Sequence, residues 1–241
     1  MGNKRFKPAR HRPFFKLVRQ LVKCFKKRPI IINKNGHFPQ QAMFISNHSG
    51  ASGPFVMGLF FPVFYVPWGA HQMTEGYRQR WGYLYYVFYQ QKLGYNRFKS
   101  FLLASTFALF SKGIYKGMNL IPTYEDIRLV KTFHQSERQL LHDRPILVYP
   151  EDSNQGYHEV LEKFNPGFAS FVVYYNRKYK TDLPVYPIYY DKNTNMMIID
   201  EPHFVQTLVE QGMNRMQIAS YFKDVTNVLG RELAGYQKYK R

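Results

Sequence analysis

Short, continuous apolar runs alternate along this chain with longer segments whose apolar residues recur at helical spacing. Strands are predicted at the apolar runs that turn residues bound: 43–45, 146–149, 183–190 and 196–199. Helices are predicted where the spacing is helical: 101–110, 127–141, 164–175 and from 204 onward. Strands that alternate with helices predict an α/β fold, with a mixed, largely buried sheet flanked by helices.

Glycine and proline refine two of these helices. Pro166 is expected near the start of the helix at 164–175. The segment 101–110 is mostly apolar, so we expect a buried helix there, with Gly113 as its terminator. The stretch 118–122 has strand character but is short and ambiguous.

A basic amphipathic helix is predicted near the N-terminus, because apolar residues recur at helical spacing among lysines and arginines over 12–28. Residues 1–28 carry 11 Lys and Arg, no acidic residue occurs before Glu75, and the chain has a formal net charge of +18. Such a segment suits a polyanion: anionic membrane lipids, nucleic acid or an acidic carrier protein. The alternative is a solvated helix packed on the domain. We therefore expect a membrane-association segment at 1–30 and a single domain at 31–241.

Aromatic residues make up 18% of the chain, which indicates a large cavity or contact with a flat apolar surface. The longest apolar run, 55–66, is interrupted by Gly58 and Pro62 and is shorter than the roughly 20 residues of a membrane-spanning helix. With the aromatic run 83–89, it is expected either to lie at a membrane boundary or to pack as a helical layer against the sheet.

Several classes of protein are disfavoured by what the sequence lacks. Cys24 is the single cysteine and no cleavable signal is recognised, so we expect a reducing compartment and a peripheral position on the cytoplasmic face of a membrane. The histidines show no paired ligand spacing, so no metal is expected. No glycine-rich phosphate loop or dinucleotide fingerprint is present, and no tightly bound cofactor is expected.

Candidate chemistry follows two of the predicted strands. His48 comes directly after the run 43–45, in a sharp polar turn, and Glu151 comes directly after the run 146–149. Sites in α/β folds lie at strand ends, and imidazole suits proton transfer near neutral pH. The alternatives are a histidine that closes the turn through hydrogen bonds and a carboxylate that caps a helix or loop.

The order of three blocks resembles the glycerolipid acyltransferase superfamily, typified by the 1-acylglycerol-3-phosphate acyltransferases. They are Ser46-Asn47-His48, Tyr149-Pro150-Glu151 and the apolar segment 183–188, within a similarity that covers roughly 40–202. The resemblance implies an α/β acyltransferase domain of phospholipid biosynthesis. It also implies that His48 acts as the general base for transfer of a fatty acyl group from acyl-CoA or acyl-carrier protein to a hydroxyl of a lipid-related acceptor.

This chain departs from the family at three positions. The family has an aspartate five residues after the histidine, where this chain has Gly53. The family also has an Ile-Pro-x-x-Arg-like block, which falls here at 121–125, so that Glu125 stands where an arginine is usual, with Arg128 as a possible substitute. After Glu151, the family's Gly-Thr-Arg is replaced by Asp152-Ser153-Asn154, so a phosphate-holding arginine is missing.

These departures define the remaining candidates. Glu151 and Asp152, and then Asp126, are candidates for the acid that orients His48; a backbone carbonyl, Ser46 or Ser52 could orient the ring less strongly. Candidate substrate-binding residues follow from the blocks and from nearby cations: Asn47, Ser49, Ser52, Lys112, Arg128 and Ser153.

Three functions are compatible with these observations. The first is a membrane-peripheral O-acyltransferase that binds anionic lipids and uses acyl-CoA or an acyl-carrier protein. The second is a catalytically inactive lipid-binding or regulatory member of the same fold, which the missing aspartate favours. The third, nucleic-acid binding, is unlikely because the charge and interspersed aromatics are supported by no recognised nucleic-acid motif.

Overall fold

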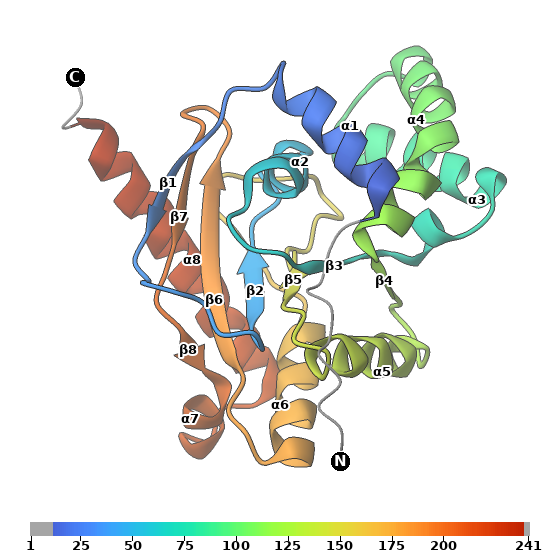
Figure 1. Ribbon diagram of the computed structural model, residues 1–241. Helices are drawn as coiled ribbons and strands as arrows, with labels where there is room; N and C mark the ends of the chain where they lie inside the picture. The colour runs from blue at the N-terminus through green and yellow to red at the C-terminus, as the bar shows by residue number, and fades with distance from the viewer. Residues whose placement is uncertain (1–11, 239–241) are drawn as a thin grey trace.

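The computed structural model describes residues 12–238 and has a mixed α/β architecture built on an eight-stranded sheet (Figure 1). The strands are β1 (Ile30–Asn33), β2 (Met43–Ser46), β3 (Val66–Ala70), β4 (Ile121–Thr123), β5 (Ile146–Val148), β6 (Pro184–Asp191), β7 (Met196–Ile199) and β8 (His203–Phe204). Their order is β1-β7-β6-β2-β5-β3-β4, with β8 paired to β6. Among these strands, β6 pairs antiparallel with β7 and with β8, and the other pairs are parallel. The predicted fold class is therefore confirmed.

Helices cover both faces of the sheet. They are α1 (Pro13–Lys23), α2 (Ser52–Phe60), α3 (Tyr77–Gly82), α4 (Arg97–Met118), α5 (Leu129–Leu140), α6 (Gly167–Tyr179), α7 (Val205–Glu210) and α8 (Arg215–Lys238). A 3₁₀ helix, η1 (His71–Thr74), and a π-helix, η2 (Tyr83–Lys92), complete the elements. Figure 1 shows α1, α2 and α4 toward the end of the sheet to which the β2 and β6 arrows point, while α8 runs behind β6.

The alternation of side chains along β2 divides the core into two layers. Met43 and Ile45 pack with α5, α6 and α8 on one face, whereas Phe44 packs with α2 and with Phe15 of α1 on the other. Every residue of β2 is buried, as expected of a central strand covered on both faces. The residues at 43–45 are all apolar, instead of alternating with polar ones, because neither face of this strand is exposed to solvent.

Two expectations for the segment 101–110 were wrong. The helix α4 continues through Gly113 to Met118, and its C-cap Asn119 adopts a left-handed conformation with a φ of 58°. A Cβ at Gly113 would lie 2.9 Å from Cε1 of Phe14, and one at Gly117 would lie 2.5 Å from Cβ of Phe15. These glycines therefore let α1 approach α4 closely instead of ending the helix.

The second error concerns burial of α4. Several of its large apolar side chains are exposed: Phe98, Phe101, Leu102, Leu109 and Phe110. The helix packs against α1, α3 and η2, so it forms an outer layer one step removed from the sheet. No helix within residues 12–238 combines the length and apolar character needed to cross a bilayer.

The aromatic run 83–89 forms most of the π-helix η2, which packs mainly against α4 and α3 and not against the sheet. Trp81 stacks on Tyr85, and its indole nitrogen donates a hydrogen bond to Ser105 of α4. π-Helices are rare in proteins, and those that occur often lie at functional sites.

Candidate active site

The register of two parallel strands brings His48 and Glu151 together. Met43 of β2 pairs with Ile146 of β5, an offset of 103 residues, and the same offset relates His48 to Glu151. Both residues follow the carboxyl ends of their strands, where the chain leaves the sheet in polar turns. The expected meeting of these two strand ends is confirmed.

One carboxylate oxygen of Glu151 holds both the backbone and the ring of His48. Oε2 accepts the backbone N–H of His48 at 2.9 Å and lies 3.3 Å from Nδ1. The Glu151 side chain is buried and that of His48 is 19% exposed. Because a carboxylate only accepts, the ring contact places the proton on Nδ1 and leaves Nε2 free to accept one.

The turn around His48 is fixed by hydrogen bonds to the neighbouring strand β6 and to the turn that follows it. The side-chain amide of Asn47 donates to the carbonyl of Tyr190 at 3.0 Å, and its oxygen accepts the N–H of Tyr190 at 2.8 Å. The hydroxyl of Ser49 accepts the N–H of Lys192 at 3.2 Å. Asn47 and Ser49 are therefore engaged with backbone groups, whereas Ser52 lines the adjoining cavity.

Gly53 occupies the position of the family's aspartate, and the local backbone explains why no larger residue stands there. Its N–H donates to the carbonyl of His48 at 2.8 Å. A Cβ at Gly53 would lie 2.3 Å from that carbonyl oxygen, which is closer than real Cβ contacts come. In this turn, the carboxylate that contacts His48 comes from the end of β5 instead.

A Gly53→Ala variant is expected to be less stable by about 1–3 kcal/mol, because the added Cβ forces the backbone of the His48 turn to move. For a chain of this size, that corresponds to a lowering of the melting temperature by roughly 2–12 °C. Gly36→Ala is the matched control, since no atom lies within 4 Å of a Cβ there. Thermal unfolding of both variants measures the difference; equal melting temperatures would contradict the steric account.

Asp152 and Ser153, the other predicted site residues after β5, have polar partners other than His48. Asp152 forms an ion pair with Lys163 at 3.0 Å, and this hydrogen bond is the main cause of the lowered pKa of Asp152. Ser153 is buried and hydrogen-bonds to the phenol of Tyr157. Their assignment to catalysis and to substrate binding stays a prediction.

Two predicted cationic ligands do not line the cavity beside His48. Arg128 is bound to the carboxylate of Asp126, with a distance of 2.8 Å between its Nη2 and Oδ2. Lys112 is exposed on α4. A role in headgroup binding for either residue stays a prediction, and the headgroup would then have to bind outside this cavity.

A cavity of about 520 Å³ adjoins His48 and is lined mainly by apolar side chains. This volume lies within the usual range for small-molecule sites. Its walls come from α1, α2, β3, η2 and α4, represented by Val18, Phe55, Trp68, Phe88 and Phe107. Helices far apart in sequence thus enclose one apolar chamber at the strand end that carries the histidine.

Lys92, at the end of η2, is a cavity residue that sequence reasoning missed. Burial lowers the pKa of its ammonium group, although the charges of Glu125, Asp152 and Glu151 act in the opposite direction. Asp152 is already engaged with Lys163, and Glu151 with His48. Lys92 therefore places a partly desolvated positive charge in the wall of an otherwise apolar chamber.

Two tyrosines flank the His48 ring and were also missed as site residues. The ring centroids of Tyr149 and Tyr157 lie 4.9 and 4.8 Å from that of His48. In the sequence, Tyr149 is noted only as part of the block that ends at Glu151, and no pattern around Tyr157 indicates a functional role. Both line the cavity.

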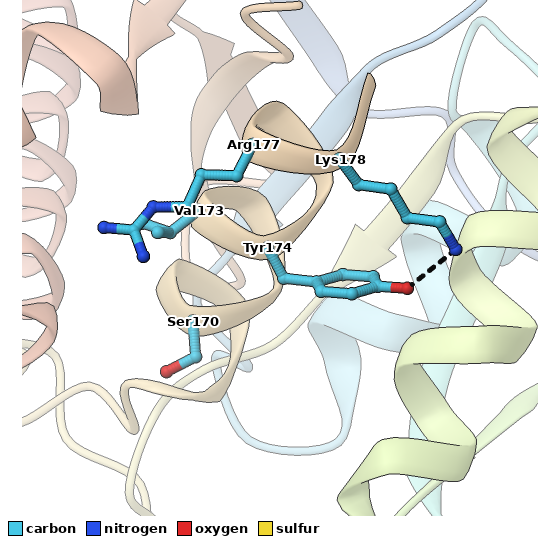
Figure 2. A pocket seen from close by; sticks show the side chains of 5 residues that line it. All are labelled: Ser170, Val173, Tyr174, Arg177 and Lys178. Atoms are coloured by element: carbon cyan, nitrogen blue, oxygen red, sulfur yellow. Dashed lines mark hydrogen bonds between the residues drawn. The ribbon is translucent and has the colours of Figure 1, made fainter. Parts of the chain in front are cut away.

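A second hollow lies on α6 alone and is lined by Ser170, Val173, Tyr174, Arg177 and Lys178 (Figure 2). Lys178 donates to the hydroxyl of Tyr174 at 3.1 Å, and both side chains bond to the carboxylate of Glu137. The polar groups of Tyr174 and Lys178 are therefore already engaged. Within residues 12–238, no group of three or more His, Cys, Asp or Glu is placed to hold a metal ion.

Comparison with known proteins places this geometry in a fold. No protein-family model matches the chain, and curated protein sequences give no significant match. Among solved structures, the chain is similar to the 1-acyl-sn-glycerophosphate (LPA) acyltransferase PlsC from Thermotoga maritima, with a TM-score of 0.51 and 13% identity. The match covers 91% of this chain and 81% of that one. The chain therefore has a glycerolipid acyltransferase-like fold.

Proposed function

We propose that this protein is a membrane-peripheral acyltransferase. It transfers a fatty acyl group from the thioester of acyl-CoA or an acyl-carrier protein to a hydroxyl of a lipid-related acceptor. The observation that carries the proposal is the contact of His48 with a buried carboxylate in the wall of an apolar cavity. An oriented imidazole beside a chamber for an apolar chain is the arrangement that such a transfer requires.

The proposed step begins with His48 as a general base. Nε2 accepts the proton of the acceptor hydroxyl while its oxygen attacks the carbonyl carbon of the thioester, and Glu151 stabilises the imidazolium through Nδ1. The carbonyl oxygen carries the negative charge of the tetrahedral intermediate. When the C=O bond forms again, the C–S bond breaks and the thiolate takes the proton from His48. The products are an ester and a free thiol.

The cavity supplies the remaining parts of the proposed site. Its apolar walls accommodate the acyl chain, and Lys92 offers a positive charge to an anionic group of the donor or acceptor. In this proposal, the charge of Lys92 takes the place of the family arginine that is missing after Glu151. An acceptor or donor that carries phosphate is therefore favoured over a neutral one.

A transfer assay tests the function. The protein is incubated with acyl-CoA or acyl-carrier protein and a panel of acceptors that includes lysophospholipids, monoacylglycerols and glycerol phosphate. We expect an acylated product and an equal amount of released thiol with at least one pair, and no product without acceptor. Hydrolysis of the thioester alone, or no reaction with any pair, would contradict the proposal.

The proposed membrane contact is formed by α1 and α4. Leu17 and Leu21 of α1 are 61% and 57% exposed, and the adjoining α4 exposes further large apolar side chains. Lys16, Lys23 and Arg19 belong to the same short helix. Residues 1–11, which complete the predicted basic segment, lie outside the described residues. We place this surface against anionic lipid at the cytoplasmic face.

A Leu17→Glu/Leu21→Glu double variant is expected to bind vesicles of phosphatidylglycerol and phosphatidylcholine about 10²-fold more weakly. The change removes two apolar contacts and adds two negative charges, each worth about 1 kcal/mol near an anionic surface. Val228→Glu on α8 is the control, since Val228 is similarly exposed. Vesicle sedimentation measures binding; equal loss in both variants would contradict docking through α1.

The second candidate function is lipid binding without turnover, which the glycine at position 53 favours. It predicts that the protein binds acyl ligands and vesicles but releases no thiol in the assay above. The two functions therefore differ in a single measurement on the unmodified protein.

A further inference from the structure

The hydroxyl of Tyr149 is buried and has no hydrogen-bond partner. Within residues 12–238, the only other buried side-chain polar atom without a partner is Nε of Arg144. Arg144 precedes β5, whereas Tyr149 follows it, with its ring against His48 and in the wall of the cavity. The ring that carries the unpaired hydroxyl thus packs against the proposed base and belongs to the wall of the cavity.

An unpaired buried hydroxyl destabilises the folded protein, because its hydrogen bonds to water are lost and not replaced. A phenylalanine ring would fill nearly the same space without that cost. The neighbouring Tyr157 shows the usual solution, since its phenol is bonded to Ser153. Tyr149 therefore has a donor that remains unused until a ligand enters the cavity.

The surroundings of Tyr149 favour a role as a donor over a role as a base. Burial raises the pKa of its phenol well above the ordinary value, and the phenols of Tyr65 and Tyr115 raise it further. The hydroxyl consequently keeps its proton at neutral pH. What it requires is an acceptor oxygen supplied by a ligand beside the imidazole of His48.

We propose that the Tyr149 hydroxyl donates a hydrogen bond to the carbonyl oxygen of the bound acyl group. This inference rests on the proposed acyl transfer. As the acceptor oxygen attacks, the carbonyl π electrons move onto that oxygen, and the hydrogen bond from Tyr149 strengthens with the developing negative charge. The charge returns to re-form the C=O bond as the C–S bond breaks. Tyr149 keeps its own proton throughout.

A Tyr149→Phe variant is expected to lower kcat about 10²- to 10³-fold, which is the usual cost of removing one donor to an oxyanion. The KM for the acceptor is expected to remain unchanged. The ligand-free variant should melt at the wild-type temperature or about 2–4 °C above it, because an unpaired polar group has been removed. A merely structural role for the hydroxyl predicts the opposite change in stability.

Two further variants sharpen this test. Tyr157→Phe loses a hydroxyl that is already bonded to Ser153 and is expected to melt at a lower temperature than the wild type. Tyr236→Phe, on the exposed surface of α8, is expected to change neither rate nor stability. Wild-type turnover in Tyr149→Phe would overturn the inference and leave the proposed function intact.

A binding experiment decides the inference even if no turnover is found. The probes are an unreactive acyl amide of pantetheine, which keeps the carbonyl, and the alkyl thioether of equal length, which lacks it. Calorimetry is expected to show that Tyr149→Phe weakens binding of the amide about 3- to 10-fold and leaves binding of the thioether unchanged. Equal effects on both probes, or no binding of the amide by the wild type, would overturn the inference.

Discussion

A His48→Ala variant is expected to transfer acyl groups at least about 10⁴-fold more slowly than the wild type. In the proposed mechanism, His48 first accepts the proton of the acceptor and then returns it to the leaving thiolate, so its loss affects both halves of the reaction. The side chain is partly exposed and contacts Glu151, Tyr149 and Tyr157 in the cavity wall. Its removal should therefore change the rate far more than the melting temperature. Initial rates of ester and thiol formation measure the effect.

The matched control is His37→Ala, because His37 is exposed in the loop before β2. It is expected to retain the wild-type rate. The His48→Ala variant should also still bind the unreactive acyl amide, since most of the cavity wall is unchanged. A His48→Ala variant that turns over as fast as the wild type would remove His48 as the base.

Much of the site geometry could be predicted because it depends on local sequence and on one rule of sheet topology. The apolar runs at 43–45 and 146–149 identify two buried strands, and parallel neighbours deliver the residues that follow them to the same edge. The proximity of His48 and Glu151 follows from that. The role of Gly53 could not be predicted, because the near-contact with the His48 carbonyl depends on the three-dimensional path of the turn.

The cavity could not be predicted because its walls are tertiary contacts between distant segments. Helical spacing predicted a helix near 101–110, but only the crossing of α1 shows why Gly113 lies inside α4. Likewise, an aromatic run does not indicate a π-helix, so the position of Lys92 beside the cavity was not anticipated. Tyr149 and Tyr157 meet His48 only after β2 and β5 have paired.

A Glu151→Gln variant is expected to lower kcat about 10- to 10³-fold with little change in KM. Oε2 accepts the backbone N–H of His48, so the amide oxygen of glutamine should take that position and keep the proton on Nδ1. The variant therefore retains the ring orientation and removes mainly the negative charge that stabilises the imidazolium. The expected range follows from the usual cost of removing one electrostatic contact with a charge that develops in the transition state.

The neighbouring carboxylates separate this role from a general effect of charge. Glu162→Gln removes an exposed carboxylate close in sequence and is expected to leave the rate unchanged. Asp152→Asn decides between the two candidate acids that follow β5: Asp152 is paired with Lys163, so its variant should lose far less activity than Glu151→Gln. A larger loss for Asp152→Asn would assign the orienting role to Asp152.

Glu151→Ala should add a loss of stability to the loss of rate, because it leaves the backbone N–H of His48 without its acceptor. Glu151 has two proposed roles: it holds the backbone of the His48 turn and it stabilises the charge of the imidazolium. A comparison of stability and rate in the alanine and glutamine variants separates the two.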